Sequence, residues 1–171
     1  MSKERGEKRP FPNYDCVKLI SSGGVGYVKR SSVVKNTHEI DRYKVTIGKI
    51  VPSNGEVDTN PEDGYKVITS NRILRPGEVH TESYLLLHGF DSLAEAENFS
   101  EYMTLKFPRF MMKHTLSSMN ISTQNFVFVP FLDYSRKWTD ADLYVRYNLT
   151  QDEIAYIEAL IRPMDLEGGD D

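Results

Sequence analysis

The chain has 171 residues, of which 39% are hydrophobic and 27% charged, with a formal net charge of −4. This length suits one domain with a sizeable core, and the composition is typical of a globular protein. There is no run of about 18 apolar residues, which excludes a transmembrane helix, and the basic start, residues 1–9, leads into no apolar stretch of the kind that a secretory signal needs. Cys16 is the only cysteine, which excludes a disulfide framework and a cysteine zinc site, so we expect a cytoplasmic chain without membrane contact.

The charge is distributed unevenly along the sequence. Residues 1–50 contain 11 Lys and Arg against 5 Asp and Glu, a local charge of +6, whereas residues 138–171 contain 2 against 9, a local charge of −7. A basic first third is compatible with a face that meets phosphate groups. DNA-binding domains are more often basic overall, however, so the charge alone leaves both interpretations open.

The first part of the chain is predicted to be an arm followed by a hairpin. Residues 1–13 combine charge with proline and predict a flexible arm. Residues 17–20 and the short runs 27–28 and 33–34 are mostly apolar and rich in valine and isoleucine, and the glycine-rich turn 21–26 separates the first run from the others. Two such runs around a turn predict a β-hairpin.

Strand signals continue to about residue 88. Further strands are expected at 43–47, 65–69 and 82–88. A loop with Asn-Gly and two prolines is expected at 52–64, and Pro76-Gly77 marks a turn before the last of these strands.

The apolar periodicity becomes helical after residue 91. Ser92 and Glu95 have the spacing of a capping box, and apolar residues follow at helical intervals to Phe107. Pro108 is expected to stop or kink this helix, because proline lacks an N–H and clashes with the preceding turn. We then expect a helix at 110–119, a buried strand at 126–129 and two helices, at 139–147 and 150–162, each with a capping-box sequence at its start.

This order of elements predicts an α+β fold with a small antiparallel sheet in the N-terminal half and helices mainly in the C-terminal half. The predicted organisation is a flexible arm at 1–13, one domain at 14–164 and an acidic flexible tail at 165–171.

The sequence carries no pattern for bond-making chemistry. Residues 23–26 are glycine-rich but lack the ending of a phosphate loop, the four histidines show no metal-ligand spacing, and there is no serine nucleophile elbow. The Asp/Asn-Pro-Pro-Tyr motif of adenine methylation is missing as well. Asp41 and Asp63 each precede a lysine by three residues, which keeps a magnesium nuclease open as a weaker alternative. We therefore predict a non-catalytic chain that binds no metal or cofactor itself.

The candidate DNA contacts form two groups. Basic residues near the first hairpin and the following strand are Lys29, Arg30, Lys35 and Lys44. The second group lies around Pro108 and in the polar run after it, residues 117–125. It consists of Lys106, Arg109, Lys113, His114, Asn120 and Gln124. Basic side chains can anchor phosphates, and amide side chains can read base edges. A solvated linker is the alternative for the polar run, and a supporting role in the fold is the alternative for Lys106 and Arg109.

Several longer stretches together resemble one protein family. They are Ile40-Asp41-Arg42-Tyr43-Lys44-Val45, Thr81-Glu82-Ser83-Tyr84-Leu85, Glu95-Ala96-Glu97-Asn98-Phe99, Thr104-Leu105-Lys106-Phe107-Pro108-Arg109-Phe110, Phe128-Val129-Pro130, Trp138-Thr139-Asp140-Ala141-Asp142-Leu143-Tyr144 and Leu149-Thr150-Gln151-Asp152-Glu153-Ile154-Ala155-Tyr156-Ile157-Glu158. The pattern is similar to the C-terminal segment of bacterial type II restriction–modification adenine-specific DNA methyltransferases, including some fused to restriction endonucleases, and it covers about residues 17–164.

The resemblance implies a target-recognition domain for double-stranded DNA that works with a methyltransferase or endonuclease catalytic domain. S-adenosylmethionine would then be bound only by that partner domain. The resemblance does not identify which bases are read. The competing hypothesis is a docking or regulatory subunit of such a system that makes no contact with DNA.

Overall fold

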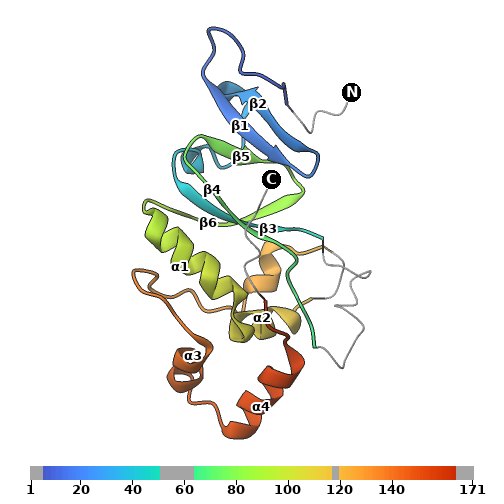
Figure 1. The fold of residues 1–171 in the computed structure, drawn as a ribbon, viewed down its shortest axis with the longest axis vertical. Coiled ribbons are helices and arrows are strands. Elements are labelled where there is room, and N and C mark those ends of the chain that lie inside the picture. The colour runs from blue at the N-terminus through green and yellow to red at the C-terminus, as the bar shows by residue number, and fades with distance from the viewer. Residues whose placement is uncertain (1–5, 51–63, 117–119, 165–171) are drawn as a thin grey trace.

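The computed structural model describes residues 6–50, 64–116 and 120–164 (Figure 1). The first five residues of the predicted arm, nearly all of the predicted loop 52–64 and the predicted acidic tail lie outside the described residues. The fold is α+β, as expected, with strands in the N-terminal half and helices mainly in the C-terminal half.

The predicted N-terminal hairpin is present. Strands β1 (Cys16–Ser21) and β2 (Gly24–Lys29) pair in antiparallel fashion, and β5 (Glu78–His80) adds to the other edge of β1 in parallel. Residue Glu7 of the predicted arm also bonds to Tyr27 of β2 through two backbone hydrogen bonds of 2.8 and 2.9 Å. This part of the arm is therefore attached to the sheet edge.

A second sheet of three strands is entirely antiparallel. Its central strand β3 (Tyr43–Gly48) pairs with β4 (Asn71–Leu74) on one side and β6 (Tyr84–Phe90) on the other. The strands expected at 43–47 and 82–88 are confirmed, the second with a shift of two residues.

Two expected strands are not formed. Residues 33–34 follow a short 3₁₀ helix, η1 (Arg30–Ser32), and Val34 is 84% exposed. Residues 65–69 are largely irregular, with an isolated bridge from Tyr65 to Ile161, and Val67 has a φ of 69° that no strand allows. The apolar residues there signalled burial rather than strand pairing, since Val67 and Ile68 are 0% exposed.

The break between the first two helices lies at Leu105 and not at Pro108. Helix α1 (Leu93–Thr104) ends before Leu105, whose backbone is extended, and α2 (Lys106–Lys113) begins directly after it. Pro108 is the third residue of α2, where a missing N–H costs no intrahelical bond. The carboxylate of Asp140 accepts hydrogen bonds from the N–H groups of Lys106 and Phe107, at 3.0 and 2.8 Å, and so caps this start.

The buried strand expected at 126–129 is wrong. The chain forms a 3₁₀ helix, η3 (Thr123–Phe126), and then irregular turns, and Val127 and Phe128 are 67% and 62% exposed. Phe126 and Val129 are partly buried against the core, whereas the two apolar residues between them lie at the surface.

The last two helices are confirmed. Helix α3 (Asp140–Arg146) begins after Thr139, helix α4 (Gln151–Leu160) begins after Thr150, and both threonines form the expected capping boxes. Ser92 is the N-cap residue of α1, but its side chain makes no capping hydrogen bond.

The main core lies between the second sheet and the helices (Figure 1). Its fully buried members include Ile47 of β3, Met103 of α1, Met112 of α2 and Ile161 after α4. No helix of the described residues has the length and apolar character needed to cross a membrane.

Candidate nucleic-acid interface

Lys44 was expected to contact DNA, and the structure contradicts this. Its side chain is 3% exposed, and Nζ donates hydrogen bonds to the carbonyl oxygens of Ile40 (2.9 Å), Arg42 (2.6 Å) and Arg75 (3.1 Å). Burial lowers the pKa of Lys44 to about 8. The ammonium group therefore holds chain segments together and cannot reach a phosphate.

Arg109 was also expected to contact DNA, and it is completely buried. Its guanidinium donates hydrogen bonds of 2.9 to 3.1 Å to four carbonyl oxygens, those of Lys66, Thr104, Leu105 and Arg162. Burial lowers the pKa of Arg109 to about 10, which leaves the group charged at neutral pH. Arg109 supports the fold, as the alternative interpretation held, and is not a DNA contact.

Three other candidates are at least partly exposed, but each contacts an internal partner. Nζ of Lys106 lies 2.5 Å from the carboxylate of Glu158 and donates to the Glu158 carbonyl oxygen as well. The guanidinium of Arg30 pairs with Asp41, and Nζ of Lys29 lies 3.6 Å from the ring centroid of Tyr14. The charges of Lys106 and Arg30 are largely compensated within the chain.

The two candidates at the end of α2 lie at its surface. Nζ of Lys113 lies 4.1 Å from the ring centroid of Tyr65, and the exposed His114 ring contacts Phe110 edge-on at 4.6 Å. A cation–π contact leaves the positive charge uncompensated, so Lys113 remains a candidate phosphate contact.

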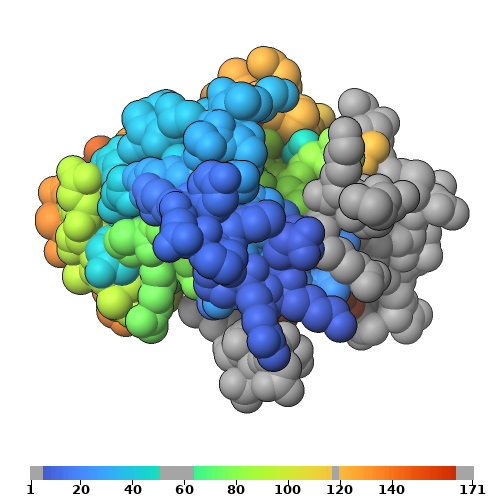
Figure 2. Space-filling view, turned by 90° about the horizontal axis from the view of Figure 1, so that it is seen from above, coloured from blue at the N-terminus to red at the C-terminus, as the bar shows by residue number. Residues whose placement is uncertain are grey.

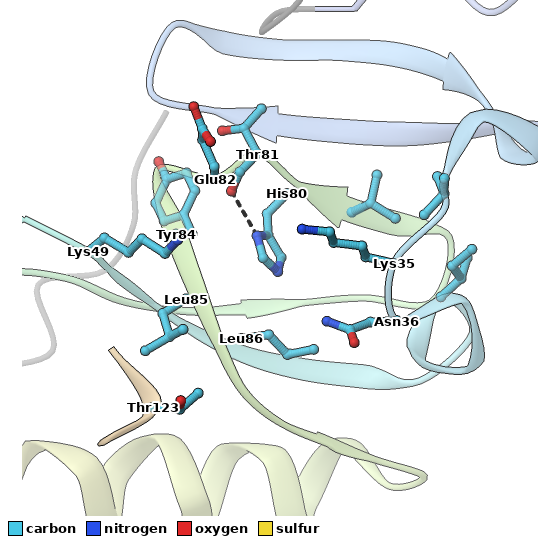
Figure 3. Close-up of a pocket in the computed structure, with 13 residues that line it drawn as sticks. Lys35, Asn36, Lys49, His80, Thr81, Glu82, Tyr84, Leu85, Leu86 and Thr123 are labelled. Atoms are coloured by element: carbon cyan, nitrogen blue, oxygen red, sulfur yellow. Dashed lines mark hydrogen bonds between the residues drawn. The ribbon is translucent and has the colours of Figure 1, made fainter. Parts of the chain in front are cut away.

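Lys35 and the polar run meet at one cavity, of about 350 Å³. It opens between the segment that precedes β3, the connection from β5 to β6, and η3 (Figure 3). The residues that line it are Val33, Lys35, Asn36, Ile40, Lys49, Val79, His80, Thr81, Glu82, Tyr84, Leu85, Leu86 and Thr123.

The cavity is electrostatically positive. The side chains of Lys35 and Lys49 extend into it from opposite sides in Figure 3. Neither ammonium group has a hydrogen-bond or ion-pair partner within the part of the chain that the structure describes. Glu82 is the one carboxylate among the lining residues, so two cations face one anion.

His80 adds a neutral acceptor between these lysines. Its Nδ1 lies 2.9 Å from the carbonyl oxygen of Thr81, and since a carbonyl can only accept, Nδ1 is the protonated nitrogen. Burial lowers the pKa of His80, and the ammonium groups of Lys49 and Lys44 lower it further. The ring is therefore neutral at neutral pH, with Nε2 as an acceptor. Nearby, the buried Oγ1 of Thr81 has no partner among the described residues.

The polar run reaches this cavity through backbone pairing. The N–H of Ile121 donates to the carbonyl oxygen of Lys49 at 2.8 Å, and Asn120 forms a β-bridge with Ile50. Asn120 and Gln124 are exposed, and Thr123, which precedes Gln124 in the sequence, lines the cavity. The candidates Lys35, Asn120 and Gln124, distant in sequence, are thus brought to one region.

The sequence analysis did not select Lys49, His80 or Thr81. Lys49 lies one residue beyond the end of β3, where a side chain is no longer bound to a sheet face. His80 and Thr81 lie at a strand end next to the parallel pairing of β5 with β1, a contact between distant segments that local patterns do not reveal.

Within the described ranges, no group of three or more His, Cys, Asp or Glu side chains could hold a metal ion. Comparisons of the chain with models of known protein families, with characterised proteins and with solved structures found no match.

Proposed function

We propose that the chain recognises double-stranded DNA and is the non-catalytic target-recognition part of a restriction–modification adenine methyltransferase or endonuclease. The observation that supports this is the cavity in which the uncompensated ammonium groups of Lys35 and Lys49 meet Thr123 of the polar run, whose exposed residues include Asn120 and Gln124. The lysines would contact phosphates and set the register of the protein on the duplex. The amides would read base edges, each bidentate pair contributing about 1–3 kcal/mol of discrimination.

The placement of charge on the whole molecule agrees with this proposal. The N-terminal residues, coloured blue to cyan, form much of the face seen in Figure 2. Residues 6–50 contain nine Lys and Arg against four Asp and Glu, and of these cations only Lys44 is buried, so an approaching duplex would meet the basic part of an acidic chain on this side. Base chemistry would be supplied by a catalytic partner domain that binds S-adenosylmethionine, in the cytoplasm.

The test is binding of a fluorescein-labelled random duplex, measured by fluorescence anisotropy over a range of salt concentrations. We expect Lys35→Gln and Lys49→Gln to weaken binding and each to reduce the slope of log K against log salt by about 1. Lys137→Gln is the matched control, because Nζ of Lys137 is already paired with Glu101 at 2.7 Å. The proposal fails if the duplex is not bound at about 50 mM salt, or if the two variants bind like the control.

A docking function is the second candidate, because apolar side chains are exposed together after η3. Val127, Phe128 and Phe131 are 67%, 62% and 62% exposed, and clustered exposed apolar groups mark protein interaction sites. These residues would contact the catalytic partner. If docking were the whole function, the anisotropy experiment would show no duplex binding for the chain alone, while Phe128→Ser would weaken capture of the catalytic domain.

A further inference from the structure

Trp138, the chain's one tryptophan, lies just before α3 and contacts two arginines. Its ring is 9% exposed, and Nε1 donates to the carbonyl oxygen of Asp133 at 2.8 Å, which fixes the indole. The guanidinium carbon of Arg136 lies 3.6 Å from the ring centroid, and that of Arg146 lies 5.5 Å from it. The three side chains line a cavity of about 450 Å³ together with Ala141, Asp142 and Val145.

This arrangement orients both guanidinium groups and leaves most of their hydrogen-bond donors unused. Contact with an aromatic face engages the flat side of a guanidinium, whereas its five N–H donors point outward along the edge. The edge of Arg136 makes one long contact, 3.5 Å to the carbonyl oxygen of Lys137. Neither Arg136 nor Arg146, both of them exposed, pairs with a carboxylate of the described residues within 4.0 Å.

Asp142 is the one acid that lines this cavity, and it is already engaged. Its Oδ2 accepts hydrogen bonds from the N–H and hydroxyl of Thr139, at 2.9 and 2.8 Å, in the capping box of α3. These bonds, with the nearby charge of Arg136, lower the pKa of Asp142. The cavity therefore holds two guanidinium groups against one fixed carboxylate, with a net positive charge in the otherwise acidic C-terminal region.

We propose that Arg136 and Arg146 form an oxyanion site that binds a phosphate group. A planar carboxylate has two oxygens in one plane, which suit a single guanidinium group. A tetrahedral phosphate presents oxygens in several directions and can accept hydrogen bonds from two guanidinium groups at once. Because stacking on Trp138 already orders Arg136, binding loses less side-chain entropy than it would at a free surface arginine. The phosphate belongs either to a nucleic-acid backbone or to a small phosphorylated molecule.

The site is separate from the first cavity, with which it shares no lining residue. Helix α3 lies at the opposite end of the long axis from β1 and β2 (Figure 1). A failure of this proposal therefore leaves the proposed role of Lys35 and Lys49 unaffected, and the reverse is also true.

Fluorescence of Trp138 tests the site directly, because no other residue of the chain contributes tryptophan emission. We expect a saturable change of emission on titration with sodium phosphate at constant ionic strength, and only a small linear change with sodium chloride. Arg136→Gln and Arg146→Gln should remove the saturable change. Arg146→Lys, which retains the charge but not the fork, should weaken phosphate binding about tenfold.

Arg75→Gln is the matched control, since it removes one exposed arginine charge from a residue that does not line this cavity. Unfolding midpoints measured by circular dichroism show whether each variant is folded at the titration temperature. The proposal is overturned if phosphate acts like chloride, or if the folded glutamine variants respond like wild type. It is also overturned if sodium acetate saturates the signal at the same concentration as phosphate, because the site would then be one for carboxylates of a protein partner.

The source of the phosphate is decided by repeating the anisotropy titration with a duplex. If a nucleic-acid backbone supplies it, Arg136→Gln and Arg146→Gln each reduce the salt slope of duplex binding by about 1. If a small phosphorylated molecule supplies it, inorganic phosphate still changes the Trp138 emission of the wild-type chain. The salt slope of duplex binding is then the same for both variants as for wild type.

Discussion

Lys44 and Arg109 are the two buried cations of the described chain, and carbonyl oxygens surround both. A buried cation without a carboxylate is tolerated only when its donors are satisfied, because the cost of desolvation is otherwise too large. Both residues connect segments that are far apart in sequence. Both residues therefore stabilise the fold, and we expect their replacement to lower the free energy of unfolding.

Arg109→Met removes the donors from four carbonyl oxygens that come from three parts of the chain. We expect the free energy of unfolding to fall by about 2–4 kcal/mol, because buried acceptors that lose their donors keep their desolvation cost. Denaturation with guanidinium chloride measures this loss. Arg109→Lys should lose less, since the ammonium retains the charge and up to three donors. Equal stability of Arg109→Met and wild type would contradict a structural role.

Lys44 should make stability depend on pH in the alkaline range. Its pKa is lowered from 10.5 to about 8 in the folded protein, because burial penalises the ammonium form. Below about pH 8 both folded and unfolded chains bind this proton, so the penalty is present in full. Between about pH 8 and pH 10.5 the folded chain has released the proton and the unfolded chain still holds it, so stability rises with pH.

Lys44→Met provides the reference for this pH effect, because it removes the titrating group. We expect the free energy of unfolding of wild type to rise relative to that of Lys44→Met by roughly 3 kcal/mol from neutral pH to about pH 10.5. Urea denaturation at a series of pH values measures the difference. A difference that stays flat over this range would show that Lys44 has an ordinary pKa.

At the scale of the element, local signals predicted much of the fold. The hairpin of β1 and β2, the strand β3, and the helices α3 and α4 lie where turn residues, alternation and capping sequences placed them. These features depend on neighbours within about four residues, which the sequence displays directly.

The alternation within β3 shows where local signals stop being sufficient. The pattern of Lys44, Val45, Thr46 and Ile47 predicts one buried and one solvent-exposed face, yet all four residues are at most 3% exposed. Both faces of β3 are covered, and Lys44 donates to carbonyl oxygens of the segment that precedes this strand. A polar residue in a strand was therefore mistaken for a surface residue, since the second covering layer is set by tertiary structure.

The capping boxes allow a matched test of element stability. Oγ1 of Thr150 accepts a hydrogen bond from the N–H of Glu153, whereas the side chain of Ser92 makes no capping bond. We expect Thr150→Ala to lower the free energy of unfolding by about 1 kcal/mol. Ser92→Ala should change it by no more than a few tenths of a kcal/mol, about the size of ordinary surface substitutions. Chemical denaturation of both variants compares them, and similar losses would show that the observed capping bond does not contribute.

At the scale of the whole molecule, the candidate site depends on contacts between distant segments. Lys35, Lys49 and Thr123 line one cavity although up to 88 positions separate them in sequence. The sequence identified Lys35 and the polar run as separate candidates on chemical grounds. It could not show that they meet, because their meeting depends on the pairing of Ile50 with Asn120 and on the bond from Ile121 to Lys49.

The segment after α4 closes the fold through another long-range contact. Ile161 is 0% exposed. The N–H of Arg162 donates to the carbonyl oxygen of Tyr65 at 3.2 Å, and the carbonyl oxygen of Arg162 accepts from Arg109 at 2.9 Å. Ile161 and Arg162 thus connect the segment at Tyr65 to Arg109 of α2.

Two shortened chains isolate this contribution, one ending at residue 164 and one at residue 160. They differ only in residues 161–164, so any effect of the residues beyond 164 cancels. We expect the shorter chain to be less stable by about 4–6 kcal/mol, because it loses the burial of one isoleucine, at about 2–4 kcal/mol, and the two hydrogen bonds of Arg162, at about 1 kcal/mol each. Guanidinium denaturation followed by circular dichroism measures both chains. Equal unfolding midpoints would mean that the bridge between Tyr65 and Ile161 contributes nothing, and that contacts of α4 itself, such as that of Glu158 with Lys106, are sufficient to hold the helix.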